Sequence, residues 1–208
     1  MAPIRSFIAA KLPVAVQLAI SGLQKRLADR DLDVRWTAAG NIHLTLKFLG
    51  LIDESRIADI AAVLAEAAGG FSPLQLAAKG AGVFPSPERA RVIWVGLAGH
   101  LVELAALQGF LAKRLAEIGF PQENRPFTGH LTLGRVKKRM PPSRVRAALD
   151  AGRDFSSEAF VVDRMVLFKS DLRPTGAVYT ELHQAPLSPS TCPEPAARAP
   201  VSFSRRNR

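Results

Sequence analysis

The chain is poor in residues that build covalent or metal-linked frameworks. Among 208 residues there are one cysteine, one tyrosine and four histidines. The cysteine, Cys192, lies in a proline-rich segment near the C-terminus, so it can support neither a disulfide framework nor a cysteine-based metal site. A catalytic role for this thiol is not expected, because no structure is predicted around it. Such sparse cysteine usage is typical of a cytoplasmic protein.

Long apolar runs are missing as well. No run reaches the roughly 18 to 20 residues that a membrane span requires, so no membrane association is expected. Lys11 and Pro13 interrupt the apolar stretch near the N-terminus, and residues 5–12 therefore read as a strand of the mature protein and not as a signal peptide. Hydrophobic residues still make up 48% of the chain, which predicts a folded globular protein.

Acidic residues are too few to balance the basic ones. The formal net charge of +10 favours a polyanionic partner, with phosphate as the obvious candidate. An arginine-rich proteome would shift every one of its proteins in this direction, so charge alone leaves the question open. The distribution of the charge is stronger evidence for a polyanionic partner, because residues 135–146 contain six basic residues and no acidic one.

Apolar periodicity predicts a mixture of strands and helices over residues 1–187. Strands are expected at 5–12, 34–37, 42–50, 74–79, 91–97, 129–136, 160–169 and 177–184, and helices at 13–30, 53–70, 101–118 and 142–151. Residues 80–90 read as a loop rich in glycine and proline. This order predicts an α+β fold, with antiparallel sheets and helices on their outer side. Residues 188–208 are rich in Pro, Ser and Arg and are predicted to be a disordered basic tail.

The tetrapeptide His-Leu-Thr-Leu occurs twice, at residues 43–46 and 130–133. Side chains alternate along a strand, so each copy should present His and Thr on one face and leucines on the other. In the first copy, the polar face is expected to carry His43, Thr45 and Lys47, and the apolar face Leu44, Leu46 and Phe48. In the second copy, His130 and Thr132 are expected to lie opposite Leu131 and Leu133.

A single strand histidine beside a threonine is most often structural, but two identical pairs suggest a shared task. Each motif strand is followed by a helix, which suggests two similar lobes. If the lobes face each other, two imidazoles and two hydroxyls meet in a cleft between them. One histidine as acid and one as base is the minimal set for metal-free displacement at phosphorus. Threonine hydroxyls can donate to phosphate oxygens, and nearby basic side chains can stabilise the developing charge.

A metal site is the rival interpretation for a pair of histidines. Neither motif contains His-x-His, and neither contains an Asp or Glu that would complete a ligand set. No metal and no cofactor are therefore expected. The residues themselves do not tell which histidine is the acid.

The doubled motif resembles the signature of the 2H phosphoesterase superfamily. More narrowly, the chain is similar to the bacterial and archaeal RNA 2′,3′-cyclic phosphodiesterase family, also called 2′-5′ RNA ligases. The similarity extends in order along residues 5–187, through "RSFIA", "RWTAAGNIHLTLKFLG", "GVFPSPERARVIWVGL", "NRPFTGHLTLGRV" and "VLFKSDLRPTGAVYTEL". Gly129 departs from the family, whose members often carry proline before the second histidine.

The resemblance implies a bilobal α+β domain over residues 1–187, with pseudo-two-fold symmetry and a site in the central cleft. It implies that RNA 2′,3′-cyclic phosphate ends are opened to a 2′-phosphate and a 3′-hydroxyl, with 2′-5′ ligation as the reverse reaction. In the family's scheme His43 donates a proton to the leaving 3′ oxygen and His130 accepts one from the attacking water. Thr45, Thr132 and Arg135 bind the phosphate.

Three of the candidate binding residues depend on details of strand geometry. Arg135 has the wrong parity to share a face with His130 on a regular strand, although Gly134 permits a bulge that would turn it inward. Lys47 shares the motif face and could contact phosphate or only solvent. Phe48 could border the base of the substrate, but its parity favours the core.

Other aromatic and histidine residues are weaker candidates. Phe84 and Trp94 flank the predicted loop and could stack on a nucleobase, although the apolar strand around Trp94 favours the core. His100 and His183 have no threonine two residues later and are interpreted as structural.

Two alternatives to RNA hydrolysis stay open. The substrate could be a small cyclic nucleotide or ADP-ribose cyclic phosphate, or the chain could be a binding module for nucleotides or RNA without turnover. The intact His and Thr of both motifs argue against the second, because binding alone needs no acid and base. Nothing in the sequence indicates an obligate dimer, so a monomer is expected.

Overall fold

The computed structural model describes residues 3–174 and 176–188. Apart from Ser188, the predicted tail and Cys192 lie outside these described residues. The α+β prediction is confirmed by nine strands and four α-helices in the described residues. The strands are β1 (Ile4–Lys11), β2 (Val34–Trp36), β3 (His43–Ile52), β4 (Leu74–Phe84), β5 (Val92–Gly99), β6 (Leu131–Val136), β7 (Phe160–Val162), β8 (Arg164–Arg173) and β9 (Gly176–Pro186). The helices are α1 (Val14–Ala28), α2 (Ile57–Gly70), α3 (Leu101–Glu117) and α4 (Pro142–Gly152).

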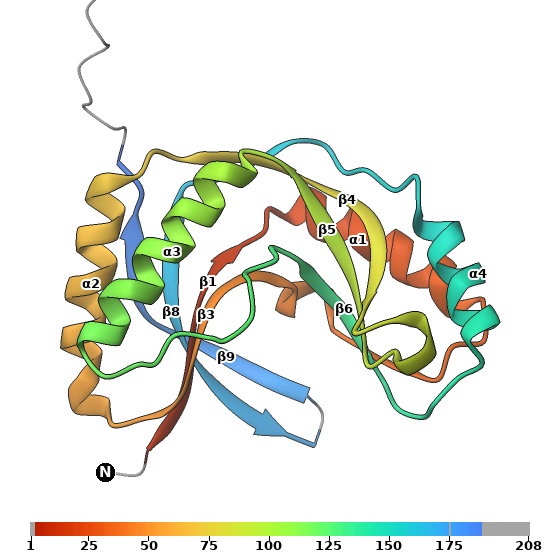
Figure 1. The fold of residues 1–208 in the computed structure, drawn as a ribbon, viewed down its shortest axis with the longest axis horizontal. Coiled ribbons are helices and arrows are strands. Elements are labelled where there is room, and N and C mark those ends of the chain that lie inside the picture. Colours follow the sequence, from red (N-terminus) through yellow and green to blue (C-terminus); the bar gives the residue numbers. More distant parts are fainter. Residues whose placement is uncertain (1–2, 175, 189–208) are drawn as a thin grey trace, which may run out of the picture.

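The strands form one curled sheet in the order β7-β4-β5-β6-β3-β1-β8-β9, and β2 pairs with β6 (Figure 1). Every strand pair of this sheet is antiparallel. The two motif strands, β3 and β6, are neighbours at its centre and meet at the pair Leu44–Leu131. We call β9-β8-β1-β3 the first half-sheet and β6-β5-β4-β7 the second. The two histidine motifs therefore lie side by side where these half-sheets join.

The helices lie in two pairs at opposite ends of the sheet (Figure 1). Helices α2 and α3 contact each other and the first half-sheet, through β8 and β9 for α2 and through β3 for α3. Helices α1 and α4 contact each other, and α4 also contacts β4. The first half-sheet thus combines strands from both ends of the chain, whereas the four strands of the second half-sheet all come from residues 74–162.

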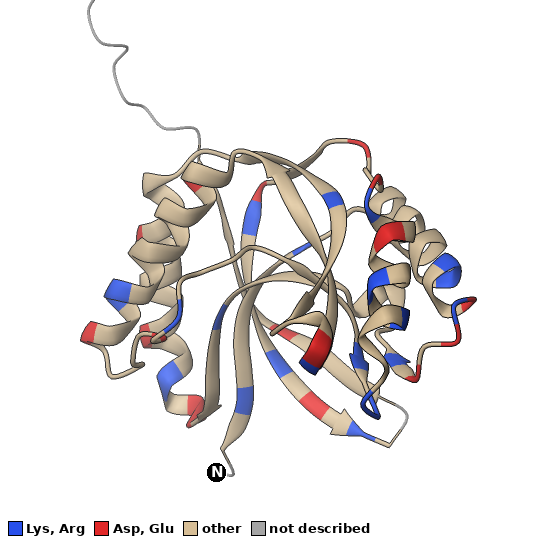
Figure 2. Ribbon diagram, turned by 45° about the vertical axis from the view of Figure 1, so that its right-hand side comes forward, with Lys and Arg blue, Asp and Glu red and all other residues tan. Residues whose placement is uncertain are grey.

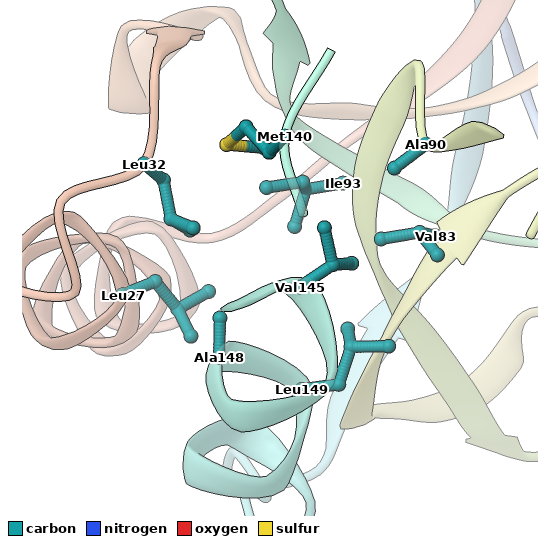
Figure 3. A pocket seen from close by; sticks show the side chains of 9 residues that line it. All are labelled: Leu27, Leu32, Val83, Ala90, Ile93, Met140, Val145, Ala148 and Leu149. Carbon is teal, nitrogen blue, oxygen red and sulfur yellow. The ribbon is translucent and has the colours of Figure 1, made fainter. Parts of the chain in front are cut away.

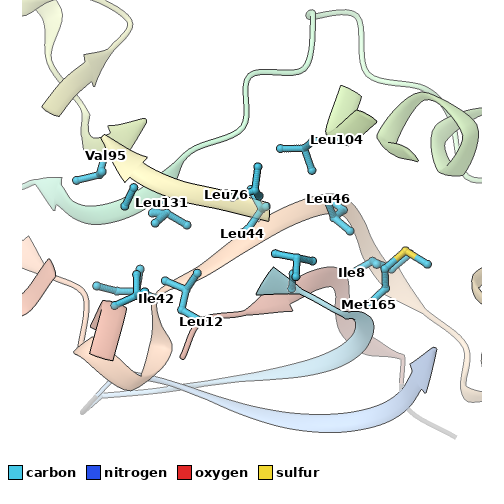
Figure 4. Close-up of a cluster of buried hydrophobic side chains, with 14 of the residues drawn as sticks. Ile8, Leu12, Ile42, Leu44, Leu46, Leu76, Val95, Leu104, Leu131 and Met165 are labelled. Carbon is cyan, nitrogen blue, oxygen red and sulfur yellow. The ribbon is translucent and has the colours of Figure 1, made fainter. Parts of the chain in front are cut away.

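One continuous core joins the half-sheets to the helices. It contains all four motif leucines, Leu44, Leu46, Leu131 and Leu133. Leu104 of α3 packs in the same core as Leu44 and Leu131 (Figure 4). The leucine face of both motifs is therefore the helix-covered face of the sheet, and the predicted burial of these leucines is confirmed. The opposite face, which carries the histidines, is called the site face below.

Several strand ends differ from the predicted bounds, and two differences change the order of the elements. Strand β4 continues to Phe84, so residues 80–84 belong to a strand and not to a loop. Gly80 makes this possible, because its φ of +64° accommodates the register shift between Lys79 and Ala81. The predicted strand 160–169 is divided at Asp163, between β7, which pairs with β4, and β8, which begins at Arg164 by pairing with β9.

A small cavity between α1, α4 and β5 is lined by apolar side chains, among them Leu27, Met140 and Val145 (Figure 3). The lining side chains offer no hydrogen-bonding group stronger than the Met140 thioether. This cavity is an imperfection of core packing and not a candidate active site. Separately, none of the described helices is long and apolar enough to cross a membrane.

Candidate active site

A β-bulge follows the threonine of the first motif. Across the β1–β3 ladder Ala9 pairs with Thr45 and Ile8 pairs with Lys47, which leaves Leu46 as the extra residue. A bulge of this kind reverses the inward and outward alternation of the residues that follow it. His43 and Thr45 keep the site face, as predicted, but Lys47 and Phe48 change sides, until a second register shift at Leu49 restores the original alternation.

The expected positions of Lys47 and Phe48 are therefore wrong. Lys47 shares the core face with Ile8, is only 3% exposed, and donates a hydrogen bond of 2.6 Å to the carbonyl oxygen of Pro121. It fastens the segment before the second motif to β3 and cannot hold a phosphate on the site face. Phe48 lies opposite Phe7 on the site face, where it is 56% exposed.

The second motif carries a bulge at the equivalent position. Trp94 pairs with Thr132 and Ile93 pairs with Gly134, so Leu133 is the extra residue. Arg135 is thereby turned to the same face as Thr132, which is the outcome that a bulge near Gly134 was expected to produce. The positive charge of Arg135 also reaches the Tyr179 side chain of β9, where it lowers a pKa that burial raises.

The two bulges make Phe48 and Arg135 equivalent positions. Each lies five residues after a motif histidine. In each strand, the bulge that follows the motif threonine turns this residue to the site face. The pseudo-symmetric strands therefore present an aromatic ring on one side of the site and a guanidinium on the other. Such a difference allows the two sides to bind chemically different parts of one ligand.

Both imidazoles are fixed in the same way. His43 Nδ1 lies 2.7 Å from the carbonyl oxygen of Asn41, and His130 Nδ1 lies 2.7 Å from that of Thr128. A carbonyl only accepts, so Nδ1 carries the proton in each ring and Nε2 is left for the site. In the neutral ring Nε2 is a base, and in the protonated ring it is an acid.

The antiparallel register brings the four motif side chains together. On either side of the Leu44–Leu131 pair, His43 falls next to Thr132 and Thr45 falls next to His130. The two imidazoles are close enough that a charge on His130 lowers the pKa of His43. The expected meeting of two histidines and two threonines is thus realised on one face of a continuous sheet.

Aromatic side chains that the sequence did not single out surround His43. Its ring stacks on Phe7, with 4.7 Å between ring centroids, and the edge of Tyr179 approaches it at 5.3 Å. Phe168 lies behind Phe7 at 5.2 Å. These side chains come from β1, β8 and β9, so only the sheet order brings them to the motif.

Burial by these aromatic groups lowers the pKa of the His43 imidazole, because the cation loses hydration there. The hydrogen bond to the Asn41 carbonyl raises the pKa, and the charge of His130 lowers it further. The folded pKa lies below that of the unfolded chain. The free energy of unfolding is therefore expected to fall as the pH drops below about 6.5, where the unfolded chain takes up the proton first.

The titration of His43 provides a direct check. In an NMR titration of the wild type, we expect its imidazole to titrate below about 6.5, the ordinary value for histidine. Phe7→Ala removes the stacked ring and should raise the pKa, whereas Phe71→Ala, whose ring contacts Phe110 in the helical layer, should not. A wild-type pKa at or above the ordinary value would refute this description of the site.

Around His130 the aromatic neighbours come from β4 and β5. Phe84 meets the imidazole edge to face at 5.0 Å, and the Trp94 ring lies 6.4 Å away. Trp94 was expected in the core, but it pairs with Thr132 and lies on the site face. Its indole can lie flat on the sheet because the facing residue is Gly82, where a Cβ atom would come within 2.2 Å of the ring.

The other two histidines lie away from this group, as predicted. His100 accepts a hydrogen bond of 3.3 Å from the backbone N–H of Gln75. His183 pairs with Leu167, a residue of the helix-covered core. Within residues 3–174 and 176–188, no three His, Cys, Asp or Glu side chains cluster as metal ligands would.

The site and the fold agree with one known family. The chain matches the LigT-like phosphoesterases twice, over residues 11–94 and 96–179, and each range contains one His-Leu-Thr-Leu motif. These ranges cover most of the chain, so the chain belongs to the LigT-like phosphoesterase family, as the sequence resemblance implied.

Curated proteins and solved structures similar to this chain point to the same family. Proteins named RNA 2′,3′-cyclic phosphodiesterase from Thermotoga maritima and Methanothermobacter thermautotrophicus are 34% and 30% identical; each match covers 86% of this chain, and 94% and 96% of those proteins. A Thermus thermophilus structure superposes with a TM-score of 0.74 at 26% identity, over 88% of this chain and 97% of that one. The structure of E. coli LigT complexed with 3′-AMP superposes with a TM-score of 0.70 at 26% identity, over 90% of this chain and 99% of that one.

Proposed function

We propose that the protein hydrolyses RNA 2′,3′-cyclic phosphate ends to a 2′-phosphate and a 3′-hydroxyl. The observation that carries the proposal is the pair of imidazoles on one face, each with Nδ1 bound to a carbonyl and with no hydrogen bond to Nε2 from the described residues. The names of the curated relatives support the same activity. The 3′-AMP complex of E. coli LigT supports a nucleotide ligand.

His43 is proposed as the proton donor and His130 as the proton acceptor. His130 Nε2 takes a proton from the attacking water, and protonated His43 gives one to the 3′ oxygen as the P–O3′ bond breaks. The low pKa of His43 in the free protein is compatible with this role. The bound phosphate anion places a negative charge beside the imidazole and raises its pKa. With a 5′-hydroxyl end in place of water, the same pair of proton transfers would form a 2′-5′ linkage, which is how ligation could occur.

Thr45, Thr132 and Arg135 are proposed to hold the reacting phosphate. The hydroxyls can donate to its non-bridging oxygens from either side of the Leu44–Leu131 pair. Arg135 supplies a charge that grows in value as negative charge accumulates in the transition state. No metal ion is needed in this scheme, because protons and positive charge are supplied by side chains.

The exposed ring of Phe48 is proposed to stack on the base of the terminal nucleotide. It continues the aromatic surface of Phe7, whose centroid lies 6.3 Å away. On the other side of the site, Phe84 and Trp94 offer a second surface for a base or ribose. We further propose that the protein acts as a monomer in the cytoplasm.

The test is hydrolysis of a short RNA ending in 2′,3′-cyclic phosphate, with EDTA present throughout. We expect multiple turnovers and a product with a 2′-phosphate and a 3′-hydroxyl. Activity that disappears in EDTA and returns with zinc would contradict the metal-free scheme. Tight binding without any hydrolysis would instead identify a binding module, and a faster reaction with ADP-ribose cyclic phosphate would identify a different substrate.

A further inference from the structure

A second arginine lies beside Arg135 on the site face. Strand β2 has three residues, of which Val34 is buried in the core and Trp36 packs against it. Arg35, between them, points to the opposite face and is exposed. In the antiparallel β2–β6 ladder it is paired directly with Arg135. The two side chains therefore project side by side, with Cβ atoms about 5 Å apart.

Two like charges in this arrangement repel each other. Within the described part of the chain, no hydrogen bond or ion pair joins either guanidinium to another group. Of the basic residues that follow Arg135, three form ion pairs: Lys137 with Asp33, Arg144 with Asp31, and Arg146 with Glu88.

What sets this pair apart from other basic residues is that two unneutralised guanidiniums are direct cross-strand neighbours on the site face. Basic residues occur both on the central strands and on the flanking helices (Figure 2). Within the described residues Lys138 and Arg139 also lack an acidic partner, so it is the direct pairing of Arg35 with Arg135 across two strands that distinguishes them. An anion at this position would be attracted to both guanidiniums and would offset their mutual repulsion.

We infer that Arg35 binds the phosphodiester immediately 5′ of the terminal nucleotide while Arg135 binds the reacting phosphate. This inference rests on the proposed function. RNA carries one phosphate per nucleotide, so two adjacent guanidiniums on long side chains can each take one, with the charge-assisted hydrogen bonds that arginine forms. A nucleoside 2′,3′-cyclic phosphate has no second phosphate and leaves Arg35 unused. Arg35 would therefore make the site selective for polynucleotide ends.

The first experiment compares kcat/KM for an RNA 10-mer and for a nucleoside, both ending in 2′,3′-cyclic phosphate. We expect Arg35→Gln to lower the ratio of the two values roughly tenfold, because one charge-assisted contact to the longer substrate is lost. Arg26→Gln on the exposed face of α1 is the matched control and should keep the wild-type ratio. An unchanged ratio in Arg35→Gln would overturn the assignment.

A binding measurement separates this inference from the proposed function. The Kd of a fluorescent RNA 10-mer ending in 2′-phosphate is measured by anisotropy at several salt concentrations. Arg35→Gln should reduce the slope of log Kd against log salt by about 0.7, the value for one single-strand phosphate contact, and Arg26→Gln should not. This result is expected even if no substrate is hydrolysed. A slope in Arg35→Gln equal to that of the wild type would refute the contact whether or not the protein is an enzyme.

Discussion

Replacing His43 or His130 by alanine is expected to lower kcat/KM for RNA 2′,3′-cyclic phosphate by about 10²- to 10⁴-fold, the usual contribution of a general acid or base. Each substitution removes the Nε2 atom that is proposed to transfer a proton on its side of the phosphate. The two losses should not add, because without either proton transfer the other is of little use. Single-turnover hydrolysis of a labelled RNA in EDTA measures the rates over this range.

The two remaining histidines provide the control. His100→Ala and His183→Ala remove the same kind of side chain from positions outside the site, and both variants should hydrolyse the RNA at nearly the wild-type rate. All four proteins are compared by thermal unfolding, so that a loss of folding is recognised. Wild-type activity in folded His43→Ala or His130→Ala would disprove the two-histidine mechanism.

Replacing Arg135 by glutamine should cost about 10²-fold in kcat/KM, because a charged donor to the transition-state phosphate is lost. Arg135→Lys should recover part of this loss, since lysine restores the charge but lacks the planar fork that fits two phosphate oxygens. The measurement is steady-state hydrolysis of the nucleoside 2′,3′-cyclic phosphate, which isolates the reacting phosphate from the rest of the RNA.

Arg26→Gln again serves as the matched charge control for Arg135. Should Arg135→Gln retain wild-type kcat/KM on the small substrate, the bulge would have brought the side chain to the site face without a role in binding phosphate. Equal losses in Arg135→Gln and Arg26→Gln would point instead to a general effect of net charge.

The sequence was sufficient for the parts of the site that lie before each bulge. His43, Thr45, His130 and Thr132 have the faces that simple alternation assigns, because the leucines between them must be buried with the helices. The mixed order of strands and helices likewise identified the α+β class. These are local consequences of periodicity, and they needed no knowledge of which strands are neighbours.

Residues beyond each bulge could not be placed by the same rule. Lys47 and Phe48 exchanged faces because Leu46 is an extra residue, and its bulge shows only in the pairing of β3 with β1. The face of Arg135 could be predicted, because Gly134 indicated a possible bulge in this strand. An equivalent glycine is missing after Leu46, where lysine follows, so the first bulge left no comparable signal.

The aromatic groups around the histidines depended on sheet order. Phe7 and Tyr179 lie far apart in the chain and reach His43 only because β3, β1, β8 and β9 are neighbours. Phe7 belongs to a strand that is buried on both faces, so its sequence pattern does not show which face it takes. The sequence gives no reason to place Arg35 at the site, because only the pairing of β2 with β6 brings it next to Arg135.

The pH dependence of kcat/KM for an RNA 2′,3′-cyclic phosphate, measured in EDTA, tests the central claim most directly. One acid and one base of opposite protonation predict a bell-shaped profile. The limb that belongs to His43 should lie below about 6.5, because burial lowers the pKa of this imidazole in the free protein. A profile with only one limb, or one that is flat between about pH 5 and 9, would contradict catalysis by two histidines.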